Sequence, residues 1–70
     1  MKISARNALK AKIKKIIHGS VNSEVVLEIS PGVEITSIIT KEAVQSLNLT
    51  EGADAYAVVK STDVMVAVDE

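Results

Sequence analysis

The segment VNSEVVLEI, residues 21–29, contains the clearest pattern in this sequence. Its odd positions hold apolar or small side chains and its even positions are mostly polar: Val21, Ser23, Val25, Leu27 and Ile29 against Asn22, Glu24, Val26 and Glu28. A period of two residues is typical of a strand with one buried face. The segment therefore predicts a β-strand, and similar patterns lie on both sides of it along the chain.

On the N-terminal side, residues 9–13 (LKAKI) alternate in the same way and predict a strand. The segment His18-Gly19-Ser20 separates it from residues 21–29. On the C-terminal side, Ser30-Pro31-Gly32 predicts a turn, because proline presets φ and glycine accepts positive φ. Residues 33–39 then resume the β pattern, which makes three consecutive strands.

A short helix is predicted after the third strand. Residues 41–47 place Ala43, Val44 and Leu47 on one helical face, and Thr40 is suited to cap the first turn. Leu49 and Gly52 close this segment, and residues 53–59 and 63–68 predict two more strands. Five short strands with one helix between the third and fourth predict a mainly β protein, an OB-like five-stranded barrel.

Composition predicts one domain, residues 1–70, that assembles with copies of itself. A chain of 70 residues buries only roughly 60% of its extended surface, so a small core needs additional support. Disulfides are excluded because there is no cysteine, and a single histidine argues against a bound metal cation. Apolar residues also occur on the second face of the strands, and subunit contacts would cover them: Val26, Ile38, Tyr56, Val58 and Met65.

Several functional classes are disfavoured. The sequence contains no P-loop, no GxSxG motif and no Cys/His pair, so we expect no enzyme. Lone His18 is interpreted as a solvated turn residue. No apolar run reaches the roughly 20 residues that span a bilayer, and the start MKISARN has no apolar signal core. The expected location is the cytoplasm.

Two polar segments could bind an anion: Ser4-Ala5-Arg6-Asn7 and Lys60-Ser61-Thr62. Arginine offers a planar fork of N–H donors, lysine a mobile charge, and serine a hydroxyl donor. The helix start at Thr40 adds further N–H groups. From the residues alone, a frayed terminus at residues 4–7 and an ordinary polar hairpin at residues 60–62 are the favoured explanation.

The combination of motifs resembles the molbindins, the Mop or TOBE-type molybdate-binding domains. The segments that carry the resemblance are ISARNALKAKI, ITSIIT, LNLTEG and AVVKSTDVMVA. Together they span essentially the whole chain. The resemblance implies an OB-like barrel, a homohexamer built as a trimer of dimers, and molybdate or tungstate bound between subunits without an organic cofactor. The implied role is storage and homeostasis of the oxyanion.

The resemblance also implies particular site residues. Ser4, Ala5 and Arg6 of one subunit would bind the oxyanion with Thr40, Lys60 and Ser61 of its neighbour. Related domains have a serine in the first helical turn, where this chain has Ala43. A second oxyanion site is expected around Gly19, Ser20 and Val21.

Two nucleic-acid alternatives remain. Lysines on the first strand could form a basic stripe on an OB fold: Lys10, Lys12, Lys14 and Lys15. Such sites stack bases on aromatic side chains, and Tyr56 is the only aromatic residue. Residues 35–59 are similar to AbrB-like swapped-hairpin modules that bind DNA as dimers. That similarity leaves both terminal motifs unexplained, and a net charge of −1 does not favour DNA.

Overall fold

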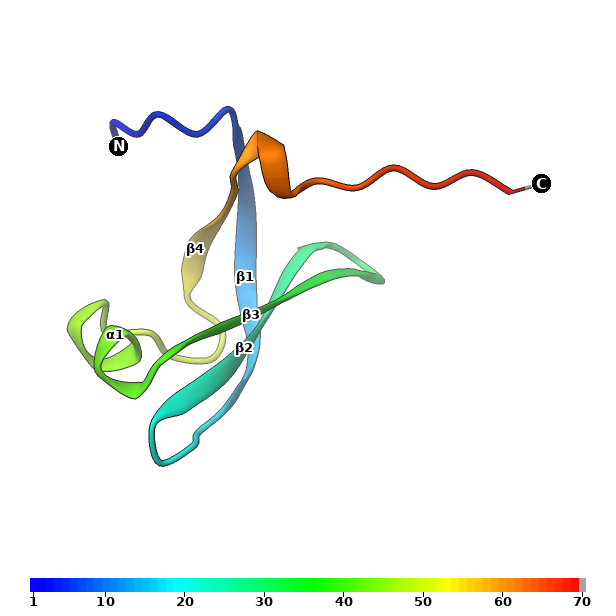
Figure 1. Cartoon of the computed structure of the whole chain (residues 1–70). Coiled ribbons are helices and arrows are strands. Elements are labelled where there is room, and N and C mark those ends of the chain that lie inside the picture. The colour runs from blue at the N-terminus through cyan, green and yellow to red at the C-terminus, as the bar shows by residue number, and fades with distance from the viewer. Residues whose placement is uncertain (70) are drawn as a thin grey trace.

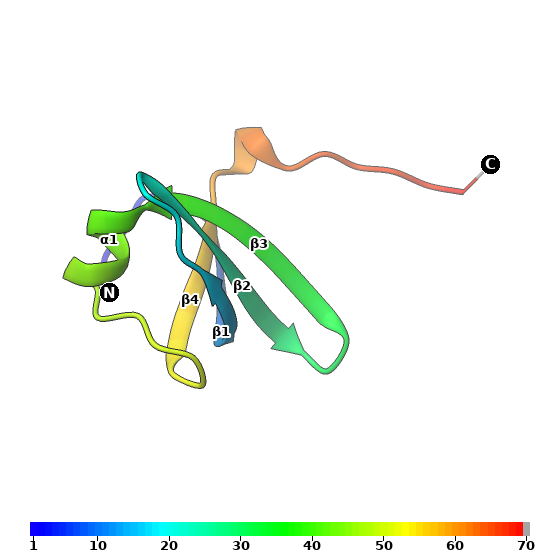
Figure 2. The same cartoon turned by 90° about the horizontal axis from the view of Figure 1, so that it is seen from below.

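The structure, a computed structural model, describes residues 1–69 and consists of one antiparallel sheet with a short helix at one end (Figure 1). Its elements are β1 (Asn7–Ile17), β2 (Asn22–Ser30), β3 (Val33–Thr40), α1 (Lys41–Ser46), β4 (Asp54–Val59) and the 3-10 turn η1 (Ser61–Asp63). The sheet order is β3-β2-β1-β4. The sheet curls, and β3 and β4 form its two edges (Figure 2).

The predicted alternation is confirmed within β2, although Val21 precedes the strand and is 71% exposed. Ser23, Val25 and Leu27 are buried, with exposed fractions of 2%, 2% and 7%. The even positions between them are only half-buried and lie on the opposite face. The concave face of the sheet carries the core, which is completed by one helical side chain: Ala11, Ile13, Val25, Leu27, Val44 and Ala57.

A β-bulge in β1 ends the simple alternation. Ile13 pairs with Leu27 but Lys15 pairs with Val26, so Lys14 is an extra residue in the ladder. Beyond the bulge the inward positions become even, and Ile16 is the residue that packs against the core. Bulges increase local twist and bend a strand, which accounts for the curl of the sheet at this point.

The predicted helix is confirmed, with Thr40 as its N-cap. The Thr40 hydroxyl accepts a hydrogen bond from the Ala43 N–H at 3.0 Å. Val44 is 5% exposed and joins the core, while Leu47 forms the C-cap and is 64% exposed. Because α1 has only 6 residues, packing of Val44 rather than helix propensity holds it in place.

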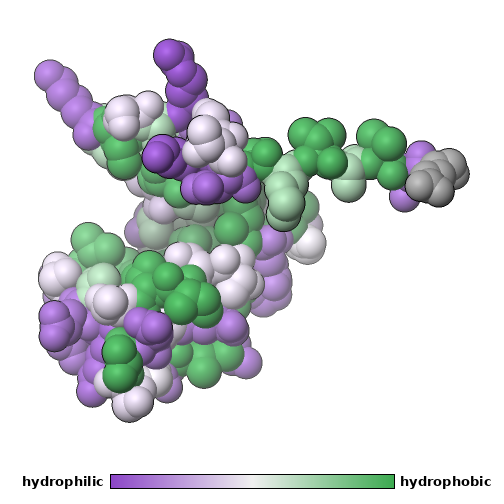
Figure 3. Space-filling view, in the orientation of Figure 1, coloured by the Kyte–Doolittle hydropathy of each residue, from purple (hydrophilic) through white to green (hydrophobic). Residues whose placement is uncertain are grey.

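The predicted fifth strand, residues 63–68, is wrong for the single chain. Asp63 ends η1, and residues 64–69 adopt no regular structure and pair with no strand. Figure 3 shows an apolar segment leaving the body of the molecule. Within this segment, Met65, Val66 and Val68 are 94%, 90% and 85% exposed. A strand needs a neighbour for its N–H and C=O groups, and η1 directs the chain away from both sheet edges. We call residues 64–69 the C-terminal tail.

The second face of the sheet is exposed, as the sequence predicts. Ile38, Tyr56 and Val58 are 61%, 49% and 38% exposed, whereas Val26 is half-buried. Single apolar residues at a surface are ordinary, but exposed apolar side chains on both edge strands together with an apolar tail are typical of a contact surface.

Candidate functional site

Antiparallel pairing of β1 and β4 brings the two predicted anion-binding segments together. The register starts with Asn7 opposite Val59, so residues 4–6 directly precede one strand and Lys60 directly follows the other. The Asn7 side chain donates to the Val59 carbonyl at 3.3 Å and to the Ser61 hydroxyl at 3.5 Å. Figure 1 shows this arrangement near the N-terminus; we call it the β1/β4 end.

The cations at the β1/β4 end are available to a ligand. Arg6, Lys60, Ser4 and Ser61 are exposed, and Ala5 is half-buried. The ion pairs among residues 1–69 join Lys12 to Asp54 and Lys14 to Glu28 and Glu34, so none uses Arg6 or Lys60. Asp63, the last residue of η1, adds a carboxylate to this end of the sheet. The Asp63 backbone N–H donates to the Lys60 carbonyl at 2.9 Å. Two cations that form no ion pair within residues 1–69 and two hydroxyls suit an oxyanion in hydrogen-bond type.

Thr40 lies at the opposite end of the sheet. It pairs with Asn22 at the start of β2, and that end of β2 pairs with the end of β1, where Ile17 is opposite Glu24. The 11 residues of β1 separate it from the β1/β4 end by about 30 Å. Residues 4–6 and Lys60-Ser61 are thus on segments that adjoin the paired ends of β1 and β4 in one chain, whereas Thr40 is at the other end of the sheet.

The predicted second site lies in the turn between β1 and β2. The Gly19 N–H donates to the Ser23 hydroxyl at 3.4 Å, and the Val21 carbonyl accepts from the Lys41 N–H at 2.8 Å. Ser20 and Val21 are exposed, and Ser23 is 2% exposed. The turn is therefore tightly tied to the start of α1 and can present backbone groups to solvent.

Gly19→Ala is expected to destabilise the protein. A Cβ at position 19 would lie 2.0 Å from the Asn22 carbonyl oxygen, so the backbone of the turn must move. Overpacking of this kind costs about 1–3 kcal/mol, or roughly 4–8 °C in Tm per kcal/mol for a domain of this size. Thermal unfolding followed by circular dichroism measures the change. Ser20→Ala is the control, and equal Tm values for the two variants would contradict the prediction.

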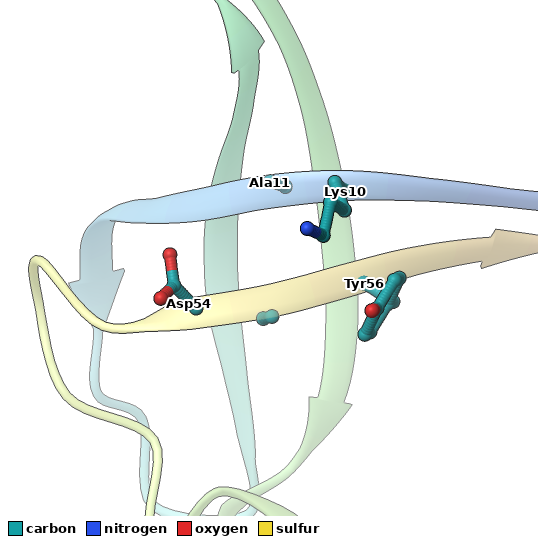
Figure 4. Close-up of a pocket in the computed structure, with 5 residues that line it drawn as sticks. Lys10, Ala11, Asp54 and Tyr56 are labelled. Carbon is teal, nitrogen blue, oxygen red and sulfur yellow. The ribbon is translucent and has the colours of Figure 1, made fainter. Parts of the chain in front are cut away.

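A shallow hollow of about 330 Å³ lies on the outer face between β1 and β4 (Figure 4). Lys10 is directly opposite Tyr56 and Lys12 is opposite Asp54, with a Lys12–Asp54 ion pair of 2.7 Å. The hydrogen bond and charge of Lys12 lower the pKa of Asp54, so this carboxylate stays ionised to lower pH than usual. The pair neutralises part of the basic stripe predicted on β1.

Lys14 is neutralised as well. Its ammonium group contacts Glu34 on β3 and lies 3.9 Å from Glu28 on β2, so the bulged residue joins three strands. The hydrogen bond that Lys14 donates to Glu34, together with the charge of Glu34, raises the pKa of Lys14, which keeps the ion pair intact as pH rises. With Lys12 and Lys14 both paired, the stripe presents fewer free charges than the sequence suggests.

Residues 1–69 contain neither a cluster of metal-ligating side chains nor a membrane-spanning helix. Among residues 1–69, His, Asp and Glu side chains form no group of three or more that could hold a metal ion. None of the helices in this range is long and apolar enough to cross a membrane.

Asn7 belongs to the polar segment predicted from the sequence, but it is not among the site residues that the family resemblance implies. It is half-buried at the first position of β1 and links the two segments that supply the cations. The available sequence signal was its position within the SARN segment, directly before an alternating strand. Its partner residues, 52 and 54 positions away along the chain, required the strand pairing.

Comparison with known proteins identifies the family. Residues 3–66 match the TOBE domain family. The chain is 56% identical over 66 residues to molybdenum-pterin-binding protein 2 of Clostridium pasteurianum, covering 94% of this chain and 97% of that protein. It superposes on MopII of the same organism with a TM-score of 0.88 and 54% identity, covering 96% of this chain and all of that one.

A second solved structure agrees in fold at lower identity. A molybdate-binding protein from Sporomusa ovata superposes with a TM-score of 0.89 and 38% identity, covering 97% of this chain and 100% of that chain. The OB-like fold predicted from the order of the elements is confirmed by these two neighbours. The chain therefore belongs to the TOBE domain family, as a small member of its Mop, or molbindin, group.

Proposed function

We propose that this protein binds molybdate or tungstate reversibly between subunits of a homo-oligomer and serves storage and homeostasis of the oxyanion in the cytoplasm. The observation that carries the proposal is the β1/β4 end, where Arg6 and Lys60 lie on adjoining segments and neither is paired with a carboxylate in residues 1–69. Two similar proteins, a molybdenum-pterin-binding protein of Clostridium pasteurianum and a molybdate-binding protein of Sporomusa ovata, support a molybdenum ligand.

The residues suit a tetrahedral dianion better than a cofactor with an organic part. Arg6 supplies two parallel donors, Lys60 one mobile charge, and Ser4 and Ser61 hydroxyls. Two positive charges balance two negative ones, and no bond of the ligand needs to be made or broken. Binding of bare oxyanion without an organic cofactor, and without catalysis, follows as part of the proposal.

Assembly is supported by the unpaired parts of the fold. The edges β3 and β4 of the curled sheet are open, and the C-terminal tail has the apolar composition of the missing strand. A tail from a second copy could pair between these edges and close a five-stranded barrel without leaving backbone groups unpaired. In a homohexamer arranged as a trimer of dimers, contacts between subunits would also bury the exposed outer face of the sheet.

The position of Thr40 gives a second reason for subunit contacts. If Thr40 contributes to the same oxyanion site as Arg6, it must come from another chain, because the two ends of one sheet are about 30 Å apart. Its hydroxyl accepts from Ala43, so its own proton is free for donation. The turn Gly19-Ser20-Val21 remains the proposed second site, served mainly by backbone groups.

Native mass spectrometry with and without molybdate tests this function. We expect a hexamer that gains several molybdate ions, with sulfate as the matched control anion. A monomer or dimer whose mass is unchanged by molybdate would contradict the proposal. The AbrB-like alternative accounts for the middle of the chain alone, whereas the family match includes residues 3–66, so DNA binding is the outcome to examine next.

A further inference from the structure

The C-terminal half of β1 has an edge that no strand covers. β4 pairs with β1 from Asn7 to Lys12, so residues 13–17 extend past the start of β4. An uncovered edge presents free N–H and C=O groups, to which a strand of another chain can add. The C-terminal tail is apolar, exposed and without regular structure, so a second copy brings a segment that could become this strand.

A turn formed by residues 50–53 (TEGA) occupies part of this edge. The Ala53 N–H donates to the Thr50 carbonyl at 3.1 Å and closes the turn, and Gly52 has a φ of 87°, which favours glycine. The Ile13 N–H donates to the Ala53 carbonyl at 2.9 Å, and the Ile13 carbonyl accepts from the Gly52 N–H at 2.7 Å. Backbone groups of the turn thus take the place of a strand opposite Ile13.

Glu51 extends this cover past the bulge in β1. Its carboxylate accepts a hydrogen bond from the Ile16 N–H at 3.1 Å. The Ile16 N–H is a donor that an added strand would need, because strands join through backbone hydrogen bonds. Glu51 belongs to none of the ion pairs within residues 1–69, so no cation there competes for its carboxylate. A side-chain acceptor satisfies the donor and, unlike a strand, offers no further backbone groups for pairing.

We propose that Glu51 is an edge cap, a side chain that prevents the C-terminal tail of a second copy from adding to β1 at residues 13–17. Subunit pairing is thereby directed to β3 and β4. The inference rests on the proposed function, because it takes the tail as the segment that joins subunits. It assigns Glu51 no contact with the oxyanion.

Glu51→Ala removes the acceptor and opens the edge. We expect the Ile16 amide to exchange with solvent at least about tenfold faster, the effect of one hydrogen bond to a charged group. We also expect assemblies larger than those of the unmodified protein at equal concentration. Hydrogen exchange followed by NMR measures the first effect, and analytical ultracentrifugation measures the second. Val66→Asp in the Glu51→Ala background should abolish the larger assemblies, because a charge in the tail opposes its addition to an edge.

Two conservative variants separate the hydrogen bond from the charge. Glu51→Gln loses the charge but keeps an acceptor oxygen at the same reach, so exchange at Ile16 and the size of the assembly should stay those of the unmodified protein. Glu51→Asp keeps the charge but is one methylene shorter, so it should resemble Glu51→Ala in both measurements. It also provides a second variant with an open edge.

The outcomes distinguish this inference from the proposed function. Larger assemblies in Glu51→Gln but not in Glu51→Asp would overturn the inference, since net charge would then limit association. Unchanged assembly sizes in both Glu51→Ala and Glu51→Asp would also overturn it, whether or not exchange at Ile16 is faster. If the unmodified protein binds no molybdate, the proposed function fails, while the comparison of assembly sizes still decides the role of Glu51.

Discussion

Arg6→Ala is expected to weaken molybdate binding by about a hundredfold or more while the protein remains folded. Removal of one partner from a desolvated ion pair costs about 3–5 kcal/mol, because the remaining charge loses its compensation. The Arg6 side chain is exposed and forms no ion pair within residues 1–69, so its loss should change the free energy of unfolding by no more than about 0.5 kcal/mol. Titration calorimetry and thermal unfolding measure the two quantities separately.

Lys10→Ala provides the matched control for this result. Lys10 is an exposed cation on β1, the strand that follows Arg6, but it lies on the outer face opposite Tyr56 rather than at the β1/β4 end. Its removal changes the net charge equally and should leave the affinity for molybdate within about twofold, since exposed charges at a distance are screened by salt. Equal losses for Arg6→Ala and Lys10→Ala would show that general attraction, rather than a built site, accounts for binding.

Val66→Asp is expected to disrupt the oligomer and, with it, molybdate binding. In the single chain Val66 is 90% exposed, so a carboxylate at this position should hardly affect folding of one subunit. If the C-terminal tail pairs between β3 and β4 of another copy, the same carboxylate becomes buried without a partner, which costs several kcal/mol. We therefore expect the subunit association constant to fall more than a hundredfold, measured by analytical ultracentrifugation.

Gln45→Glu serves as the control for Val66→Asp, because it adds the same charge to an exposed position of α1. It should assemble like the unmodified protein. An oligomer of unchanged size in Val66→Asp would mean that the tail makes no subunit contact, and the exposed face of the sheet would then have to carry assembly. Circular dichroism verifies that both variants retain their β structure.

The Arg6 and Val66 variants test two different features of oxyanion binding. Arg6 tests the local charge balance at the β1/β4 end, whereas Val66 tests whether a second chain is needed at all. If Val66→Asp gives monomers that still bind molybdate, then residues 4–6 with Lys60 and Ser61 suffice, and Thr40 is not a ligand. Such a result would separate capture of the oxyanion from assembly.

Local patterns were sufficient to predict most elements. The alternation in residues 21–29 predicted both the strand and the buried positions Ser23, Val25 and Leu27, because side chains in a strand point to opposite faces. Thr40 was predicted as the helix cap, because a threonine oxygen there meets the N–H of the third helical residue. These features depend on neighbours within a few residues, so the sequence contains the information directly.

The bulge at Lys14 and the course of the C-terminal tail could not be predicted in this way. In the sequence, Lys14 continues the alternation of residues 9–13. Its ion pairs with Glu28 and Glu34 nevertheless join three strands, and no local pattern specifies the register of those strands. Residues 63–68 have the composition of a strand, yet a strand forms only where another backbone is available to accept its hydrogen bonds. In one chain that partner is missing.

By itself, the sequence determined the β-rich class, the order of the first four strands and the helix, and the two segments that carry Arg6 and Lys60. Only the tertiary structure decided that these segments share one end of the sheet, that Thr40 lies at the other end, and that Asn7 donates to Ser61. Periodicity and capping act between residues close along the chain. The contacts at the β1/β4 end join residues more than fifty positions apart, and antiparallel register alone brings them together.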